Sequence, residues 1–432
     1  MRNPIHEVRL FLSYPLNMRV LLLTNFIFAF TGPIVGIFIG TYLMRQTAND
    51  VKAPVIYQLM LYAGIPLTFL VNGFLLKRMP VTWLYSLGML ISGGSIWWMM
   101  SLKQLSLGGI AVAGLFMGMA TGFYWANRDF LAISSTNDGN RNYYYGLEAF
   151  LGTTVGMVMP VAVGSFIHWY PKTGQTPVAA YRILAVCVFV ISLVASLMVN
   201  RGEYKNPPAT RFVFFRFHPL WLRLQMLAAV KGLSSGYTVM VPAMLSMLFL
   251  AGKEGTLGFI QSAGAVLTAV MMYLIGRLAK PRHRIPMYAI GMILYAIGTI
   301  PNALFYDRTS AMWFMICLMF AGPLPDLADT TVQMLTIDTV SAIEGRSMYA
   351  YILNREFGYF AGRASGLILF LALAYGISNV FALRYSLLLV GIVQLLTIWI
   401  IRSLVKGCAA YATTAHLPKE EVELAVEMAE PV

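Results

Sequence analysis

The chain has few charged residues and few cysteines for its length. Of its 432 residues, 11% are charged and 58% are hydrophobic, and the mean hydropathy is +0.69, whereas a soluble domain carries roughly 25% charged residues. The three cysteines have no ligand-like spacing, which argues against a disulfide framework and against a metal motif. A phosphate-binding Gly-Lys-Ser/Thr loop is missing as well, so nothing indicates an enzyme, an ATP-driven pump or a cofactor.

Long apolar runs take the place of charged segments. A helix needs roughly 20 residues to cross about 30 Å of hydrocarbon, and we find twelve runs of that length. The sequence therefore predicts an all-α membrane protein with twelve transmembrane helices in the lipid bilayer, at about 17–43, 54–76, 81–101, 105–133, 141–168, 178–199, 221–250, 255–279, 285–305, 309–340, 347–375 and 379–402.

Lysine and arginine residues are unevenly distributed between the loops. Nineteen lie near the termini, in a central linker and in alternate loops, against eight in the opposite loops. Because positively charged loops stay on the cytoplasmic side, we expect both termini in the cytoplasm and the chain in the plasma (inner) membrane. The formal charge of +13 then reports topology and contacts with lipid headgroups rather than a nucleic-acid surface.

The segment 200–223 is the longest one that cannot lie in hydrocarbon. It contains five basic residues and three prolines, and proline interrupts a spanning helix. We predict a basic cytoplasmic linker here, between an N-terminal six-helix bundle at 1–199 and a C-terminal six-helix bundle at 224–405. A cytoplasmic tail is expected at 406–432.

Matching residues recur about 200 positions apart, in equivalent predicted helices. This recurrence indicates a duplicated six-helix unit, and such duplicated transporters bind substrate near the midplane, where the halves meet. The matches pair Ala63-Gly64 with Ala263-Gly264, and Gly152 and Gly156 with Gly358 and Gly362.

The loop after the second helix of each predicted half carries a similar motif. Gly73 is followed by Lys77 and Arg78, and Gly276 is followed by further basic residues up to Lys280. With its 6 + 6 helices and basic linker, the whole chain resembles a major facilitator superfamily transporter. The resemblance implies two pseudo-symmetric bundles that rock around a central cavity, a small-molecule substrate and a coupling ion such as the proton, and we expect a monomer. Both loops have lysine where the family has aspartate, which argues against a branch such as the sugar porters; Lys77 and Arg78 are assigned to a gate.

Ionisable residues at bilayer depth are costly, at least roughly 2.5–3.5 kcal/mol each, so they usually serve a function. We expect Arg128 to bind an anionic group between the aromatic side chains of Tyr124 and Trp125, with Asn127 beside it. The alternative is a gate formed with Asp129. Neighbours on a helix point about 100° apart, so Arg128 and Asp129 are predicted not to pair directly.

Glu148 is the predicted proton-coupling residue of the N-terminal half. A buried carboxylate with neighbouring glycines can exchange a proton near neutral pH. The alternative is a structural ion pair with Arg128 or Arg141.

Asp326 and Asp329 are the predicted proton-coupling residues of the C-terminal half. They follow the segment 322–325, Gly-Pro-Leu-Pro, which is expected to break the helix. Their spacing of three residues places both carboxylates on one helical face, where one of them takes up a proton easily. The alternative is pairing with Arg355 or Arg363.

The eleventh predicted helix carries a polar triplet that aligns with the Glu148 region through the glycine register. Asn354 and Arg355 are assigned to substrate binding, with Arg355 contacting an anion or Asp329, and Glu356 is assigned to a gate. For Lys231 two interpretations stay open: it reaches the membrane surface, or it faces a carboxylate. Further polar or aromatic residues are expected to complete the substrate cavity, namely Asn25, Gln58, Tyr62, Tyr237, Gln261 and Gln333.

We therefore predict a secondary active transporter that moves a small organic solute, anionic or zwitterionic, by alternating access with proton coupling. One alternative is a proton-driven exporter of drug-like or siderophore-like molecules. An alternative of another class is a lipid-handling or scaffold membrane protein without a gated cavity.

Overall fold

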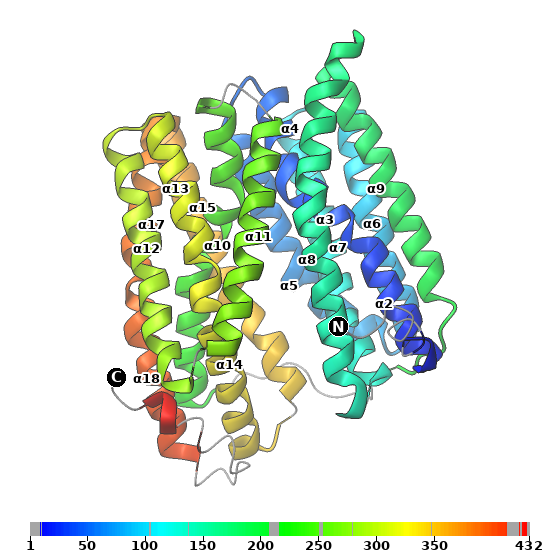
Figure 1. Cartoon of the computed structure of the whole chain (residues 1–432), viewed down its shortest axis with the longest axis vertical. Helices are drawn as coiled ribbons and strands as arrows, with labels where there is room; N and C mark the ends of the chain where they lie inside the picture. Colours follow the sequence, from blue (N-terminus) through cyan, green and yellow to red (C-terminus); the bar gives the residue numbers. More distant parts are fainter. Residues whose placement is uncertain are drawn as a thin grey trace. The chain divides into compact units, whose positions relative to one another are not determined.

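The computed structural model describes residues 9, 11–102, 105–136, 138–206, 216–249, 254–278, 280–346, 348–412, 423 and 426–429. All regular elements in these ranges are helices (Figure 1), which confirms the all-α prediction. Eleven of the described helices are long and apolar enough to cross a membrane. A twelfth, α6 (Val81–Ser101), also has a spanning length of 21 residues, but serine, glycine, tryptophan and tyrosine make it less apolar.

The chain divides into two compact units. Unit 1 contains Met1–Thr47, Ile56–Ala209 and Glu254–Ser262, and unit 2 contains Ala48–Val55, Thr210–Lys253 and Ala263–Val432. The first nine residues of α11 thus group with unit 1, and the remainder of that helix groups with unit 2.

The helices before the central linker match the predicted spans to within a few residues. The first span is interrupted near Pro33 by a π-helical turn, as expected where proline removes a backbone hydrogen bond. The elements are α2 (Leu16–Ala29), α3 (Thr31–Pro33), η1 (Ile34–Phe38), α4 (Ile39–Gln46), α5 (Lys52–Leu75), α6, α7 (Leu107–Ser135), α8 (Asp138–Trp169), η2 (Tyr170–Thr173) and α9 (Pro177–Val199).

The helices after the linker also follow the prediction, with two longer ends. Helix α14 extends past residue 340, where the tenth span was predicted to end, and α18 extends past residue 402, the predicted end of the twelfth span. The elements are α10 (Pro219–Phe249), α11 (Glu254–Leu278), η3 (Pro281–His283), α12 (Arg284–Leu304), α13 (Arg308–Ala321), α14 (Pro323–Glu344), α15 (Met348–Gly376), α16 (Asn379–Phe381), η4 (Ala382–Ser386), α17 (Leu387–Gln394) and α18 (Leu396–Ala412).

The predicted break in the tenth span is present. Helix α13 ends at Ala321 and α14 begins at Pro323, with Gly322 between them. A proline in the first helical position costs no hydrogen bond, because that amide would have no intrahelical partner. The break therefore ends one helix and starts the next, and it places Asp326 in the first turn of α14.

The start of the central segment packs against unit 1. The Asn206 amide donates to the carbonyls of Leu76 and Met79, at 3.0 and 2.9 Å, and its oxygen accepts from the Val81 amide at 2.8 Å. Helix α10 begins at Pro219, within the predicted linker range. The linker prolines at 207 and 208, the loop residue Ala279 and most of the predicted tail lie outside the described residues, as do the side chains of Arg141 and Arg277.

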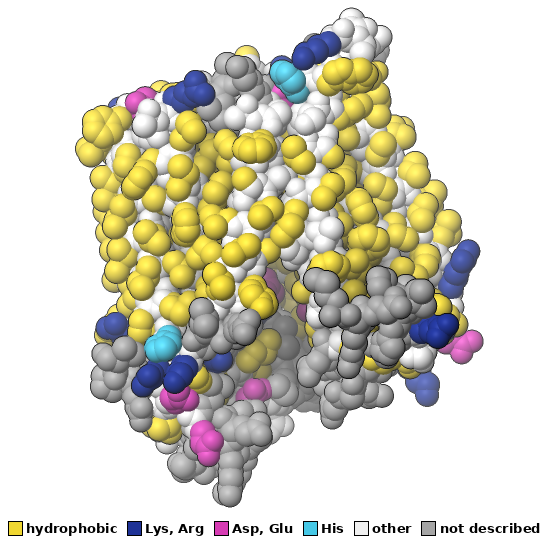
Figure 2. Space-filling model, viewed as in Figure 1, with side chains coloured by type: hydrophobic (Ala, Val, Ile, Leu, Met, Phe, Trp, Pro, Cys, Tyr) yellow, Lys and Arg dark blue, Asp and Glu magenta, His cyan; other side chains and the backbone are white. Residues whose placement is uncertain are grey.

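Side chains of different kinds occupy different levels of the surface. In Figure 2 apolar side chains cover the middle of the visible helices within each unit, and most of the visible charged side chains lie near the helix ends. Exposed apolar residues follow one face of α9, including Val186, Val190 and Leu197. An exposed apolar band bounded by charge is the surface that a lipid bilayer covers.

Candidate functional site

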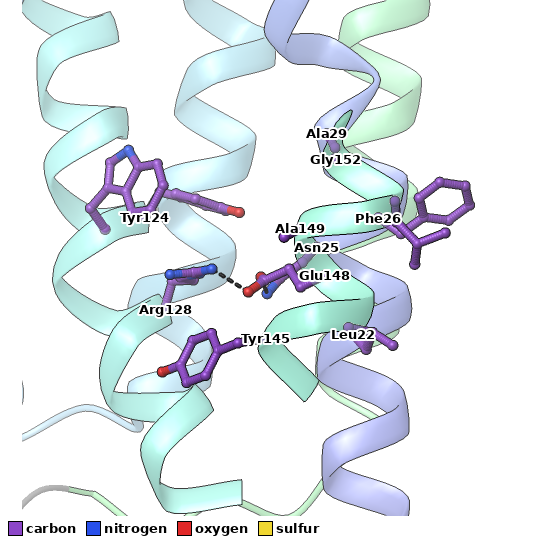
Figure 3. Close-up of a pocket in the computed structure, with 12 residues that line it drawn as sticks. Leu22, Asn25, Phe26, Ala29, Tyr124, Arg128, Tyr145, Glu148, Ala149 and Gly152 are labelled. Atoms are coloured by element: carbon purple, nitrogen blue, oxygen red, sulfur yellow. Dashed lines mark hydrogen bonds and ion pairs between the residues drawn. The ribbon is translucent and has the colours of Figure 1, made fainter. Parts of the chain in front are cut away.

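Unit 1 contains a cavity of about 420 Å³ between α2, α7 and α8 (Figure 3). Its wall is mostly apolar or aromatic, with one arginine, one glutamate and one asparagine. This mixture is typical of a small-molecule site, in which a few polar groups orient a largely apolar ligand. The lining residues are Leu22, Asn25, Phe26, Ala29, Tyr124, Trp125, Arg128, Tyr145, Glu148, Ala149, Leu151 and Gly152.

Glu148 is held by two neighbouring helices. One of its carboxylate oxygens forms an ion pair with Arg128 of α7, and the other accepts a 2.7 Å hydrogen bond from the Asn25 amide of α2. Figure 3 shows the Arg128 and Glu148 side chains pointing toward each other across the cavity. The structure thus has the ion pair that the sequence left open as an alternative for Glu148, and it brings Asn25, Arg128 and Glu148 together.

Asn25 connects this pair to a further helix. Its carbonyl oxygen accepts a hydrogen bond from the Tyr85 hydroxyl of α6, and its amide also donates to the Tyr144 hydroxyl at 3.0 Å. Both tyrosines are fully buried, and a buried polar group without a partner would be costly. The network therefore ties α2, α6, α7 and α8 to one carboxylate.

Arg128 also pairs with Asp129, which corrects our prediction. Nη1 of Arg128 lies 2.6 Å from Oδ1 of Asp129. The angle between neighbouring positions describes their Cβ atoms, whereas the long arginine side chain can turn back toward its neighbour. The Asp129 side chain is 51% exposed, and the Arg128 guanidinium lies between two carboxylates.

Aromatic rings flank the Arg128 guanidinium. Its central carbon lies 5.3 Å from the Trp125 ring centroid and 6.0 Å from that of Tyr145, within reach of a cation–π contact. The Trp125 ring remains 48% exposed. The sequence indicated the tryptophan but not Tyr145, which lies three residues before Glu148 on α8, one turn away.

Asn127 lies outside the cavity, although the sequence assigned it to substrate binding. It is fully buried, and its side chain exchanges two amide hydrogen bonds with Asn72 of α5, at 2.9 and 3.2 Å. Its amide also donates to the Phe123 carbonyl at 2.8 Å. Asn127 therefore joins two helices.

Replacing Asn127 by alanine is expected to destabilise the protein without affecting a ligand in the cavity. The buried Asn72 amide would lose its partner, at a cost of roughly 1–2 kcal/mol in the free energy of unfolding. Denaturant titration of the purified protein measures this loss. A native-like free energy of unfolding together with impaired solute binding would instead indicate that Asn127 takes part in solute binding.

Unit 2 contains a second buried polar cluster, centred on Asp329. Oδ2 of Asp329 forms an ion pair with the Lys231 ammonium of α10 and accepts a 2.7 Å hydrogen bond from Gln333, one turn further along α14. Asp329 is 5% exposed. Of the two interpretations open for Lys231, the structure shows the one in which it faces a carboxylate.

Two arginines of α15 extend this cluster. The Arg355 guanidinium donates to Gln333 at 2.5 Å, and Arg363 donates to the Ser235 hydroxyl at 3.2 Å. Glu356 lies 3.6 Å from Arg355 and 3.5 Å from Arg363. Arg355 therefore reaches Asp329 only through Gln333, and Glu356 lies between the two arginines.

Two buried atoms of the cluster have no hydrogen-bond partner within the described part of the chain. They are Oδ1 of Asp329 and Nε of Arg355, an acceptor and a donor. Asp326 lies in different surroundings, because its side chain is exposed while that of Asp329 is buried. The sequence suggested the same proton-coupling role for both acids, but the structure places their side chains in different environments.

Five other predicted site residues lie away from these clusters. Tyr237 is fully buried and donates to the Gly366 carbonyl at 2.9 Å. Asn354 accepts hydrogen bonds from Trp221 and Gln225 of α10, so it joins α10 to α15 as Asn25 and Glu148 join α2 to α8. Gln261 is half-buried on α11, and Lys77 and Arg78 are exposed at the turn after α5.

The sequence did not indicate a third buried carboxylate, Glu254, in unit 1. It is 4% exposed, pairs with Arg45 of α4 and accepts a 3.3 Å hydrogen bond from the Tyr181 hydroxyl, which contacts Thr41 at 2.8 Å. The available signal was an acid in the first turn of a strongly apolar helix. A buried carboxylate in this position needs a cation nearby.

The described residues contain no group of three or more histidine, cysteine, aspartate or glutamate side chains that could hold a metal ion. The polar clusters of both units are built from ion pairs, amides and aromatic rings.

The chain is similar in sequence to two proteins whose function is not described. The chain is 24% identical over 367 residues to an uncharacterized protein, YqgE, of Bacillus subtilis (strain 168), and the alignment covers 82% of each chain. It is 27% identical over 168 residues to an uncharacterized protein in the sodM 3′ region of Geobacillus stearothermophilus, covering 38% of this chain and 78% of that one.

Solved structures share the fold at low sequence identity. A bacterial homologue of the iron transporter ferroportin, in an inward-facing state, superposes with a TM-score of 0.63 at 15% identity, covering 88% of this chain and 98% of that one. The nucleoside transporter NupG gives a TM-score of 0.60 at 12% identity, covering 90% and 100%. Identities this low establish the fold alone.

The family is established by a profile that covers most of the chain. The Major Facilitator Superfamily profile matches residues 21–362, which include the unit 1 cavity and all of the unit 2 cluster except Arg363. The all-helical fold with its candidate membrane spans agrees with this match. The chain belongs to the major facilitator superfamily of secondary transporters.

Proposed function

We propose that this transporter couples solute movement to protons through the ion pair of Asp329 and Lys231. The observation that carries the proposal is the environment of Asp329, a buried carboxylate with one oxygen paired to an ammonium and the other without a partner. A proton on Asp329 would remove the charge that Lys231 faces. Protonation would therefore change the balance of forces between α10 and α14, which is what coupling requires.

Glu148 is the corresponding candidate in unit 1. Its two oxygens are already occupied by Arg128 and Asn25, so a proton would compete with an ion pair. Asp329 has an unoccupied oxygen, and we therefore assign coupling first to Asp329. Asp326 is exposed and serves as the control position.

Transport in proteoliposomes under an imposed pH gradient tests this assignment. We expect the native protein to concentrate its solute when the gradient is applied and only to equilibrate it otherwise. Asp329→Asn should retain exchange of solute between the two sides but lose gradient-driven accumulation, whereas Asp326→Asn should retain both. Accumulation by Asp329→Asn equal to that of the native protein would contradict the proposal.

We propose a small organic solute. Some structural neighbours are named for iron, metals or nucleosides, but the described residues contain no group of three or more histidine, cysteine, aspartate or glutamate side chains that could hold a metal ion. The sequence favoured an anionic or zwitterionic solute because of Arg128. Since that guanidinium already faces two carboxylates, the zwitterionic alternative is the better supported one.

We also propose that both termini lie in the cytoplasm, that the protein resides in the plasma (inner) membrane and that it functions as a monomer. The uneven distribution of lysine and arginine supports the orientation. An exporter of drug-like molecules is the second candidate, because aromatic and apolar side chains make up most of the unit 1 cavity. Efflux of a fluorescent dye from loaded cells would favour this candidate over uptake.

A further inference from the structure

We propose that the unit 1 cavity binds the positively charged group of an organic solute. The proposal deepens the transport function above and depends on it for its physiological meaning. It concerns the lining residues Arg128 and Glu148 with their aromatic neighbours, and Asp129, which pairs with Arg128 without lining the cavity. It assigns to this cavity the opposite charge preference from the one that the sequence suggested.

The charges of the cavity carry the first part of the argument. Arg128 is the only basic residue among the lining side chains, and it is paired with both Glu148 and Asp129. Two carboxylates against one guanidinium leave the group with one excess negative charge when all three are ionised. An anion would add to that excess, whereas a cation would neutralise it.

The surroundings of the carboxylates carry the second part. Asp129 is not a lining residue; it contacts the lining residue Arg128 through one oxygen, and its side chain remains 51% exposed. Trp125, one helical turn before Asp129, is 48% exposed and lines the cavity together with Glu148 and Tyr145. A carboxylate next to electron-rich rings is an arrangement that recognises alkylammonium groups.

Unit 2 shows by contrast that this charge excess is a local feature. Its cluster contains Lys231, Arg355 and Arg363 against Asp329 and Glu356. Basic groups therefore outnumber acidic groups there by three to two. Of the two described clusters, only that of unit 1 has an excess of negative charge.

The test compares two water-soluble aromatic ions of similar size and opposite charge, phenyltrimethylammonium and benzenesulfonate. Calorimetric titration of the full chain in lipid nanodiscs, with empty nanodiscs subtracted, measures binding without any transport step. We expect saturable binding of phenyltrimethylammonium and none of benzenesulfonate. Tighter binding of the sulfonate, or no saturable binding of the ammonium, would overturn the proposal.

Three variants locate the binding. Glu148→Gln and Asp129→Asn each remove one negative charge, and each should weaken ammonium binding, Glu148→Gln by about tenfold and the more exposed Asp129 by about threefold. Glu203→Gln makes the same chemical change at an exposed position outside the cavity and should leave binding unchanged. Equal affinity in all three variants would show that the ion binds elsewhere.

The outcome is independent of proton coupling. If Asp329→Asn retains accumulation but the ammonium binds as expected, the coupling assignment fails and the cation site stands. If coupling is found and the ammonium does not bind, the cation site fails alone. Asp129→Asn is expected to perturb folding less than Glu148→Gln does, because the Asp129 side chain is half-exposed and Arg128 keeps its partner Glu148.

Discussion

Lys231→Met is expected to destabilise the protein by roughly 3–5 kcal/mol, because it leaves the buried Asp329 carboxylate without a cation. Only Gln333 would then bond to this carboxylate, since Oδ1 of Asp329 has no partner in the native structure. The methionine side chain has a similar length, so the loss of charge dominates over the loss of volume. Unfolding of the purified protein by denaturant measures the difference.

A second substitution separates charge from packing. Lys231→Met combined with Asp329→Asn removes both charges, and the asparagine oxygen can still accept the hydrogen bond from Gln333. This double variant should therefore recover most of the stability that the single variant loses. A double variant no more stable than Lys231→Met alone would mean that packing, and not the unpaired carboxylate, causes the loss.

Gly362→Ala should cost at least about 2–3 kcal/mol in the free energy of unfolding. A Cβ atom at this position would lie 1.9 Å from the carbonyl oxygen of Ala229 and 2.9 Å from Cα of Gly232. Both contacts are with backbone of α10, so no side chain can rotate away and the two helices would have to separate. Small residues permit such close approach between membrane helices.

Gly156→Ala is the matched control, in a helix of the other unit. A Cβ atom there meets nothing within 4 Å, and alanine is a better helix former than glycine by up to about 1 kcal/mol. Its stability should equal or slightly exceed that of the native protein. A similar loss in both variants would show that alanine is disfavoured for reasons other than the contact with α10.

The glycine pair also shows how far the sequence could predict the fold. Hydropathy predicted every spanning helix to within a few residues at most of its ends, since a bilayer fixes the length of an apolar helix. The same sequence register paired Gly156 with Gly362, but only Gly362 packs against another backbone. A repeat in sequence preserves helix order, whereas the close contacts depend on which neighbours each helix meets.

The candidate site was predictable as a set of residues but not as a set of contacts. Charged residues at bilayer depth identified Arg128, Glu148 and Asp329, because such residues need partners. The partners depend on rotamers and helix packing, so the pairing of Arg128 with Asp129 was wrongly excluded. Asn127 and Tyr237 were selected for polarity alone, and they form hydrogen bonds within the packed helices.

Asn25 connects the cavity to a helix that does not line it. Its amide group holds Glu148 on one side and accepts from the Tyr85 hydroxyl on the other, and Tyr85 belongs to α6, which contributes no lining residue. A solute that draws Glu148 away would free the asparagine to turn, and Tyr85 would lose its acceptor. Binding of a solute in the cavity would therefore change the hydrogen bonding of α6, a helix that the solute does not contact.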